Sequence, residues 1–333
     1  MGNVENIYTH VLKFLKLLYF VINLFGVCNS QLSPTFYATS CPNMSKIVRG
    51  VIKRARKDDA RIGAKFIRLQ FHDCFVSGCD ASLLLDDANG KDSEKNARPN
   101  LSIEGYEVID KIKTKLERVC PGVVSCADII SLASQISVSL VWGSNMQVQL
   151  GRKDSREAFL NRTIVIPGPR ETLSEILQKF RDQGLDSTDL VALSGAHTFG
   201  SARCTVFSHR LYNFNGTGRP DPSLDPKYLQ SLRGQCPNIE KQSPPTLIKL
   251  DRTTPNYFDN NYFKNLKKKS GLLQTDQELF STPGAKTVAI VERFAENQTD
   301  FFESFSEAMM KMGNIMTLTG NKGEIRMNCR KVN

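Results

Sequence analysis

The sequence predicts one mainly α-helical domain with long loops, preceded by a short N-terminal leader. Apolar residues recur with helical spacing through most of the chain, a single segment alternates in the manner of a strand, and the loops are rich in Gly, Pro and Asn. A length of 333 residues suffices for one large domain or two modest ones. Cys126 and Cys329 could tie the middle of the chain to its C-terminus, which favours one domain.

Residues 1–30 have the layout of a secretory signal peptide. An apolar run at 17–27 follows Lys13 and Lys16 and ends in small or polar residues, which predicts cleavage near Ser30. A membrane anchor is the alternative, but the run is short for spanning a bilayer. Cleavage would expose Gln31, which can cyclise to pyroglutamate (pyrrolidone carboxylic acid), and would leave 31–333 as a secreted domain without a membrane segment.

The helical stripes follow in order along the mature chain. They comprise Ile47, Val48, Val51 and Ile52 after a possible Asn43 cap; Ile109, Ile112, Leu116 and Val119; Leu173, Ile176, Leu177 and Phe180; Val288, Val291 and Ala295; and Phe301, Phe302, Phe305, Met309 and Met312. Thr172 and Glu175 form a predicted capping box, and Gly184 ends that helix. The alternating segment MQVQL (146–150) is the predicted strand, and loops are expected at 86–101, 161–171, 213–226 and 234–246.

Cysteine usage fits an exported protein. Loss of the leader removes Cys28 and leaves eight cysteines, and an even count in an exported chain predicts four disulfides. Buried free thiols and a zinc site are the alternatives, although the absence of a C-x-x-C pair disfavours zinc. The N-x-S/T sequons of a glycoprotein occur at Asn43, Asn100, Asn161, Asn215 and Asn297.

The chain is basic, with 44 Lys and Arg against 34 Asp and Glu and a net charge of +10. The leader holds two of the Lys and one Glu, so the mature chain keeps a charge of about +9. No nucleic-acid motif or interleaved aromatic pattern accompanies this excess, which argues against nucleic-acid binding. We interpret it as attraction to acidic polysaccharide or as plain solubility.

The stretch IRLQFHDCFVSGCDASLLL (67–85) concentrates polar chemistry beside an apolar helix. Arg68 and His72 are four residues apart, so on a helix they share one face. Oxygen donors then recur at Asp73, Val76, Gly78, Asp80 and Ser82, in a loop that Cys74 and Cys79 could close. Such a loop suits a hard cation such as calcium, although it lacks the EF-hand spacing and an ordinary polar turn is the alternative.

Two further segments carry candidate groups. The run LDRTTPNYFD (250–259) is also rich in oxygen donors, with Asp251, Thr254 and Asp259. His197 lies in an apolar helix, where a histidine is more often structural than a ligand on position alone. His209 has no neighbouring carboxylate or cysteine, and we interpret it as a surface residue.

The mature chain resembles the secreted plant haem peroxidases (class III) over residues 31–333. The blocks that carry the resemblance are RLQFHDCFVSGCDAS, VSCADI, LGRKDS, DLVALSGAHTFG, GLLQTDQELF and MGNI, in this order. The resemblance implies ten or more helices in two halves that enclose a haem, with few short strands. It also implies a monomeric extracellular enzyme that reduces hydrogen peroxide and oxidises phenolic donors by one-electron steps, as in cell-wall phenol coupling and stress responses.

The resemblance assigns roles around haem b. His197 would be the iron ligand, with Asp276 accepting the hydrogen bond of its other ring nitrogen. His72 would be the distal base, Arg68 its cationic partner, and Asn100 the group that orients it, which is incompatible with a glycan on Asn100. Pro167 would lie near the donor.

The resemblance also implies two calcium ions and a disulfide pattern. The first ion would be held by Asp73, Val76, Gly78, Asp80 and Ser82 with help from Glu94, and the second by Thr198, Asp251, Thr254, Tyr257 and Asp259. The disulfides would be Cys41–Cys120, Cys74–Cys79, Cys126–Cys329 and Cys204–Cys236. The same blocks predict a buried ion pair between Asp128 and Arg152.

Several positions depart from the family pattern, and two other functions are alternatives. Gln70, Met146, Leu250 and Glu104 replace more usual residues without removing a catalytic group. The main alternative is a structural glycoprotein that binds cell-wall polysaccharide and keeps the fold but turns over slowly. A calcium-binding hydrolase is disfavoured because the sequence offers no evident Ser-His-Asp set or paired carboxylates.

Overall fold

The computed structural model describes residues 32–86, 92–142, 146–238 and 246–333, and it is mainly helical there. The α-helices are α2 (Met44–Asp58), α3 (Ile62–Phe75), α4 (Tyr106–Val119), α5 (Cys126–Trp142), α6 (Leu173–Asp182), α7 (Ser187–Ser194), α8 (Cys204–Tyr212), α9 (Pro226–Gln235), α10 (Asn261–Lys267), α11 (Gln274–Ser281), α12 (Lys286–Glu296) and α13 (Gln298–Gly313). Short 3₁₀ turns are η1 (Ser82–Leu84), η2 (Glu94–Asn96), η3 (Leu160–Val165), η4 (Gly195–Thr198) and η5 (Phe214–Gly216). The predicted signal peptide and Gln31 lie outside the described residues.

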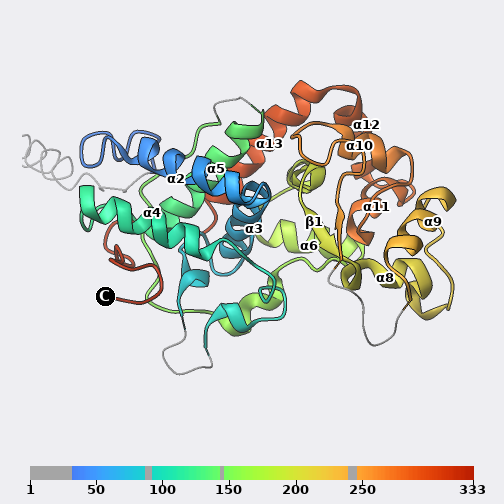
Figure 1. The fold of residues 1–333 in the computed structure, drawn as a ribbon, viewed down its shortest axis with the longest axis horizontal. Coiled ribbons are helices and arrows are strands. Elements are labelled where there is room, and N and C mark those ends of the chain that lie inside the picture. Colours follow the sequence, from blue (N-terminus) through green and yellow to red (C-terminus); the bar gives the residue numbers. More distant parts are fainter. Residues whose placement is uncertain (1–31, 87–91, 143–145, 239–245) are drawn as a thin grey trace, which may run out of the picture.

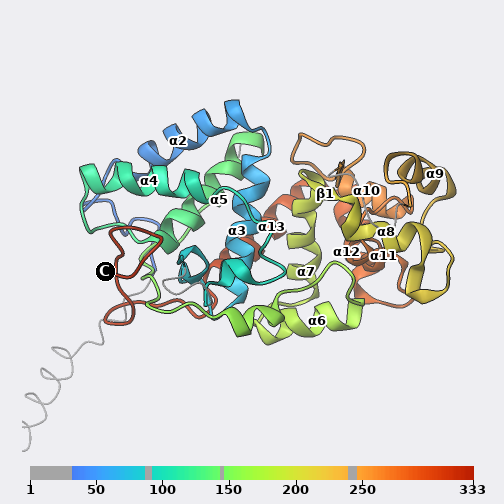
Figure 2. The same ribbon diagram turned by 60° about the horizontal axis from the view of Figure 1, so that its bottom comes forward.

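The helices form two groups. Figure 1 shows α2 to α5 on the left and α8 to α12 on the right, and Figure 2 shows α6, α7 and α13 between them. Helix α13 packs against its neighbour α7, against α3 of the left-hand group and against α12 of the right-hand group. The C-terminal segment returns to the left-hand group beside α4 in both views. The predicted architecture of two helical halves is therefore confirmed.

Amphipathic spacing explains how these helices pack. The predicted stripe of α2 is buried at Val48, Val51 and Ile52, and α2 packs on α4 and α5. In α6, Thr172 and Glu175 form the predicted capping box, each side chain bonding the other residue's backbone N–H. The prediction for Val119 was wrong, because it lies at the end of α4 and its side chain is exposed.

The strands differ from the prediction. The segment MQVQL forms no strand, and its last residue makes only an isolated bridge from Leu150 to Ser33. The described strands are instead β1 (Ser201–Arg203) and β2 (Leu247–Lys249), which pair antiparallel with Ser201 opposite Lys249. Alternation in the sequence was insufficient because a strand also needs a neighbouring backbone to accept its hydrogen bonds.

Four disulfides fasten the fold, with the pairing that the resemblance implied. They are Cys41–Cys120, Cys74–Cys79, Cys126–Cys329 and Cys204–Cys236. Cys126–Cys329 joins the start of α5 to the C-terminal segment, 203 residues further along the chain. Among the residues that the structure describes, no helix combines the length and apolarity needed to cross a bilayer.

Candidate active site

His72 and Arg68 lie on one face of α3, as their spacing predicted. Arg68 Nε is 3.3 Å from His72 Nε2, and the guanidinium also donates to the carbonyls of Pro99 at 2.9 Å and Ser102 at 3.1 Å. The loop that precedes α4 therefore holds the Arg68 side chain in place. Because a guanidinium can only donate, His72 Nε2 is the accepting nitrogen in this pair.

Asn100 defines the tautomer of His72 from the other side of the ring. Its Oδ1 is 2.7 Å from His72 Nδ1, and its Nδ2 donates to the carbonyl of Glu94 at 2.8 Å. Because the amide nitrogen is already used, Oδ1 must face the ring and Nδ1 must carry the hydrogen. Asn100 is only 2% exposed, whereas the asparagines of the other four sequons, Asn43, Asn161, Asn215 and Asn297, are exposed.

The environment keeps the His72 imidazole neutral. Burial, together with the charge of Arg68, lowers the pKa of His72 to about 3, and the hydrogen bond to Asn100 opposes both effects. A neutral ring with a free lone pair on Nε2 can accept a proton from a ligand beside it. The geometry thus provides a positioned base with a fixed cation next to it.

His197 lies in η4 and is held by a carboxylate. Asp276 Oδ1 is 2.7 Å from His197 Nδ1, although 79 residues separate the two in sequence. Asp276 also accepts from Tyr262 Oη at 3.0 Å and from the backbone N–H of Leu273 at 3.0 Å. Burial disfavours the protonated imidazole, but Asp276 outweighs burial and the pKa of His197 is raised. Sequence reasoning missed Tyr262, which no motif distinguishes from an apolar core tyrosine.

The surroundings of His197 fit a haem. Its Nε2 makes no hydrogen bond to any described residue, and 35% of its side chain is accessible although η4 packs against α7 and α10. Across from it, Ala64, Arg68 and Phe71 line one face of α3 and stay partly exposed. Ala64 of this face lies beside Gly200, which follows His197 by three residues. An imidazole with Nδ1 bonded to a carboxylate and Nε2 free is the usual arrangement of a metal-ligating histidine.

The loop after α3 gathers buried oxygens without partners. Asp73 Oδ1, Ser82 Oγ and Glu94 Oε2 are buried and have no hydrogen bond. Burial and the nearby carboxylates raise the pKa of Asp73, and burial with Glu94 raises that of Asp80 to about 7. No cluster of three or more His, Cys, Asp or Glu arranged for a metal occurs among the described residues. Mixed carboxylate, hydroxyl and carbonyl oxygens of this kind instead fit a hard cation such as calcium.

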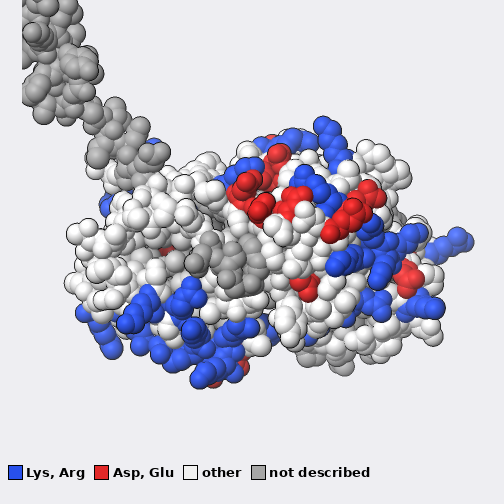
Figure 3. Space-filling view, turned by 90° about the horizontal axis from the view of Figure 1, so that it is seen from above, with Lys and Arg blue, Asp and Glu red and all other residues white. Residues whose placement is uncertain are grey.

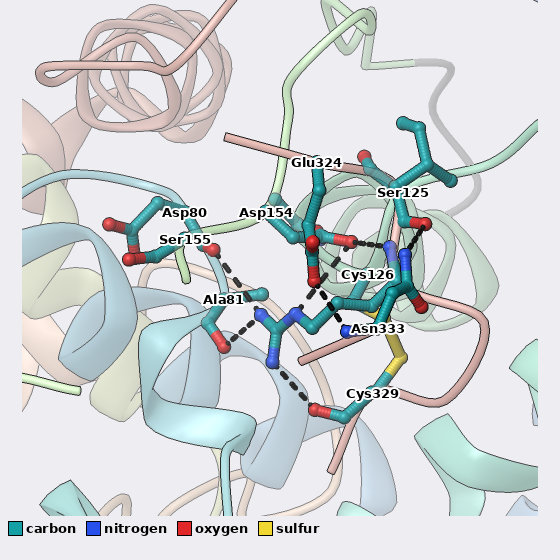
Figure 4. A network of polar contacts seen from close by, with 12 residues as sticks. Asp80, Ala81, Ser125, Cys126, Asp154, Ser155, Glu324, Cys329 and Asn333 are labelled. Atoms are coloured by element: carbon teal, nitrogen blue, oxygen red, sulfur yellow. Dashed lines mark hydrogen bonds and ion pairs between the residues drawn. A yellow bond between two sulfur atoms is a disulfide. The ribbon is translucent and has the colours of Figure 1, made fainter. Parts of the chain in front are cut away.

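A buried network connects this loop to the C-terminal segment (Figure 4). Arg326 is fully buried and donates to the carbonyls of Ala81 at 2.6 Å and Cys329 at 2.7 Å. Its Nε lies 3.9 Å from Asp154 Oδ2. Ser155 N–H donates to the carbonyl of Asp80 at 2.8 Å. Two segments distant in sequence thereby hold the backbone at 80–81, where Ala81 has a positive φ of 58°.

The oxygen-rich segment 250–259 also brings its side-chain oxygens close together, beside Thr198. Thr198 Oγ1 lies 3.5 Å from Asp251 Oδ2 and 3.3 Å from Asp259 Oδ1, and Thr254 Oγ1 lies 3.3 Å from Asp251 Oδ2. Burial raises the pKa of Asp251, with Asp259 adding to the effect. Oxygens gathered at these long distances fit a shared cation. The phenol of Tyr257 is 66% exposed, so its contribution to such a site would come from the backbone carbonyl.

The remaining predictions have mixed outcomes. The buried pair Asp128–Arg152 is confirmed at 2.8 Å. Pro167 is partly exposed after η3, and no hydrogen bond among the described residues joins it to the His72 side. The interpretation of His209 as a surface residue was wrong, because its ring is half buried and Nε2 lies 3.0 Å from Gln274 Oε1.

Comparison with known proteins decides which family carries this geometry. The family model described as Peroxidase matches residues 48–297. The chain belongs to the plant class III haem peroxidases. It is 54% identical over 325 residues to the lignin-forming anionic peroxidase of Nicotiana tabacum, covering 97% of this chain and 99% of that protein. It is also 57% identical over 309 residues to peroxidase 15 of Ipomoea batatas, covering 92% and 94%, and 52% identical over 300 residues to peroxidase 2 of Cucumis sativus, covering 90% and 100%.

Membership of this family establishes the class of reaction that the protein catalyses. A class III peroxidase is an oxidoreductase that contains haem, reduces hydrogen peroxide and oxidises phenolic donors. Of the positions that depart from the family pattern, Glu104 lies away from His72 and His197. It forms ion pairs with Lys65 and with Arg61, the latter at 3.8 Å, on the solvent side of α3.

Proposed function

We propose that this peroxidase works outside the cell with two histidines in distinct roles, His197 as the iron ligand and His72 as the proton-transfer base. The observation that carries the proposal is the pair of 2.7 Å contacts at Nδ1, from Asn100 to His72 and from Asp276 to His197. Each contact leaves Nε2 of its ring available, one for a proton and one for a metal. Haem b, once bound, supplies the redox chemistry of peroxide reduction and donor oxidation.

His72, Arg68 and Asn100 would then transfer the proton and stabilise the charge that develops. Peroxide entering beside His72 would displace the Arg68 hydrogen bond from Nε2, and Nε2 would take the proton of one peroxide oxygen. The imidazolium would return that proton to the second peroxide oxygen, which leaves as water. Arg68, anchored by Pro99 and Ser102, stabilises the negative charge that develops as the O–O bond lengthens. Asn100 keeps the ring in the tautomer that makes this transfer workable.

Asp276 and its hydrogen-bond partners would set the basicity of His197, the proposed iron ligand. Asp276 accepts the Nδ1 hydrogen of His197 and so increases the basicity of the ligating nitrogen. Tyr262 and the Leu273 backbone hold the carboxylate in place. Because Asp276 is buried, its charge acts on the imidazole with little solvent screening.

Two calcium ions are part of the proposal. One would bind the loop formed by Asp73, Val76, Gly78, Asp80 and Ser82, with Glu94 assisting, and the other Thr198, Asp251, Thr254, Tyr257 and Asp259. The unpartnered buried oxygens of Asp73, Ser82 and Glu94 support the first site. Each site adjoins a catalytic histidine, since Asp73 follows His72 and Thr198 follows His197.

The proposal extends to the setting of the enzyme. The leader supports secretion after signal cleavage, a monomer is expected from the family resemblance, and the exposed asparagines, rather than Asn100, are the expected glycan sites. A relative named for lignin formation supports cell-wall phenols as donors near Pro167. The positive charge supports association with acidic wall polysaccharide.

Haem content and donor oxidation test the proposal. The secreted protein should show a Soret band and peroxide-dependent guaiacol oxidation, and His197→Ala should lose most of its bound haem. His209→Gln, which removes a histidine outside the site, should keep both. Full haem retention in His197→Ala would refute the ligand assignment, and haem-free wild-type protein that still binds polygalacturonate would favour the structural glycoprotein.

A further inference from the structure

Helix α2 presents an unusual concentration of positive charge. The cations on it are Lys46, Arg49, Lys53, Arg54, Arg56 and Lys57, of which all but the partly exposed Arg49 are exposed. The one acidic residue of the helix is Asp58, at its C-terminal end. Figure 3 shows a blue area at the lower left of the molecule with very little red beside it. We refer to these six residues as the α2 basic face.

The basic face lacks acidic partners. None of the six residues forms an ion pair with a described residue; Arg49 donates to Ser139 Oγ at 3.2 Å and Arg56 to the carbonyl of Leu140 at 2.9 Å, both neutral acceptors. The next cations along the chain differ, because Asp59 and Glu104 neutralise Arg61 and Lys65. Figure 3 likewise shows red among the blue on the right-hand half. The positive charge of the basic face is therefore not neutralised by any described acidic residue.

The helical repeat places all six cations on one side of α2 and sets Lys46, Lys53 and Lys57 in a row along it. The buried residues Met44, Val48, Val51 and Ile52 occupy one side of α2, so the cations fall on the opposite side. From Lys46 to Lys57 the row is about 16 Å long, at 1.5 Å per residue. Asp58 lies roughly 100° or more around the helix from Lys46, Lys53 and Lys57 and does not interrupt their row; it is on the side of Arg54, four residues earlier.

We propose that the α2 basic face is a docking site for a linear polyuronate, an acidic polysaccharide with one carboxylate on each sugar ring. A straight row of flexible cations matches a polymer of regularly spaced carboxylates. No large apolar side chain is exposed on α2 among the described residues, so the face lacks the apolar contact of a membrane-bound helix and the stacking surface of a nucleic-acid site. The tobacco relative is named anionic at 54% identity, so the fold does not itself require this charge.

Docking at α2 leaves the active site free. No hydrogen bond or ion pair among the described residues joins the basic face to Arg68, His72 or His197, and α2 packs on α4, α5 and α3. The protein bound to a polyuronate would keep its access to peroxide and donor. This inference rests on the proposed secretion, but it stands or falls separately from the catalytic roles.

Charge-neutralising variants of the haem-loaded protein test it. The triple variant Lys46→Gln, Lys53→Gln, Lys57→Gln should weaken binding to polygalacturonate roughly 10-fold, since exposed ion pairs each contribute a small factor. The control is Lys227→Gln, Lys264→Gln, Lys268→Gln, which removes the same charge from exposed residues without ion pairs on α9 and at α10. The control should bind like wild type, and binding should fall with added salt and with methyl-esterified polymer. Both variants should keep the wild-type Soret band and guaiacol activity.

Three outcomes would overturn the proposal. Equal loss in both triple variants would mean that net charge alone drives association. Wild-type binding that is absent, or unaffected by the α2 substitutions, would exclude the face. Tighter α2-dependent binding to anionic vesicles or to duplex DNA than to polygalacturonate would assign it to another polymer or surface. Activity serves as a separate readout, so failure of the catalytic proposal would be recognised independently.

Discussion

At the scale of single residues, Asp276 does its work through His197. Its carboxylate is buried and holds three donors, the His197 ring, the Tyr262 hydroxyl and the Leu273 N–H. Asparagine at this position would keep an acceptor oxygen but remove the charge. The effect of the charge on the iron can therefore be separated from the effect of the hydrogen bond.

Asp276→Asn should raise the reduction potential of the bound iron. Loss of such a partner typically costs about 10–100-fold in metal affinity. Where the oxidised iron bears this loss, each tenfold change in its affinity relative to the reduced iron corresponds to about 59 mV for one electron. A rise of roughly 60–120 mV in a spectroelectrochemical titration is expected. Asp182→Asn, an exposed carboxylate on α6, is the control. An unchanged potential in Asp276→Asn would rule out the tuning role.

Glu104 gives a second residue-scale prediction. It is 46% exposed and pairs with Lys65, which lowers the pKa of Glu104. Glu104→Gln should therefore lower the free energy of unfolding by about 0.5–1 kcal/mol at pH 7. Because the carboxyl pKa is lowered by folding, this contribution is present above its ordinary pKa and is lost as the pH falls through the folded value. Urea titrations of both proteins should show the difference shrink as the pH falls from 7 to 3; a constant difference would contradict the pairing.

The sequence predicted residues that act through short-range spacing better than those that act through long-range contacts. Arg68 and His72 share a helix face, so their proximity follows from the helical repeat. Asp276 and Asn100 could be assigned only through the family resemblance, because nothing local links them to a histidine. Tyr262 and the half-buried His209 escaped prediction because burial depends on tertiary packing.

At the scale of elements, the C-terminal segment stabilises the loop at 80–81. Arg326 reaches the carbonyl of Ala81 from a position that Cys126–Cys329 fixes against α5. Amphipathic helices such as α2 and α6 were predictable because their stripes span several turns. The three-residue strands β1 and β2 were not, because such short segments carry no usable period.

Arg326→Leu should destabilise the fold strongly. It leaves Asp154 buried without its cation and frees the Ala81 carbonyl, which should cost about 3–5 kcal/mol. Arg156→Leu removes an exposed arginine from the neighbouring pair with Glu324 and should cost about 1 kcal/mol or less. Denaturant unfolding of the two variants measures the contrast, and similar losses would show that the buried network contributes no more than a surface pair.

At the scale of the whole molecule, calcium should couple stability to activity. Removing it leaves Asp73, Asp80 and Glu94 as buried neighbouring carboxylates. For binding at 100 times the dissociation constant, the loss is about 2.7 kcal/mol, which corresponds to a fall in Tm of roughly 4 °C for a domain of this size. Calorimetry with and without chelator measures the fall, and Asp73→Asn should respond less than wild type. A verified calcium-free sample with unchanged Tm and activity would reject the calcium proposal.

The central claim is that His72 is the base of peroxide activation. Its most direct test is the second-order rate constant for the Soret change after mixing the haem-loaded protein with hydrogen peroxide by stopped flow. General acid–base catalysis contributes about 10²–10⁴-fold, so His72→Leu should slow this reaction by that range, while His209→Gln reacts at the wild-type rate. A His72→Leu protein with full haem content and an unchanged rate constant would contradict the claim.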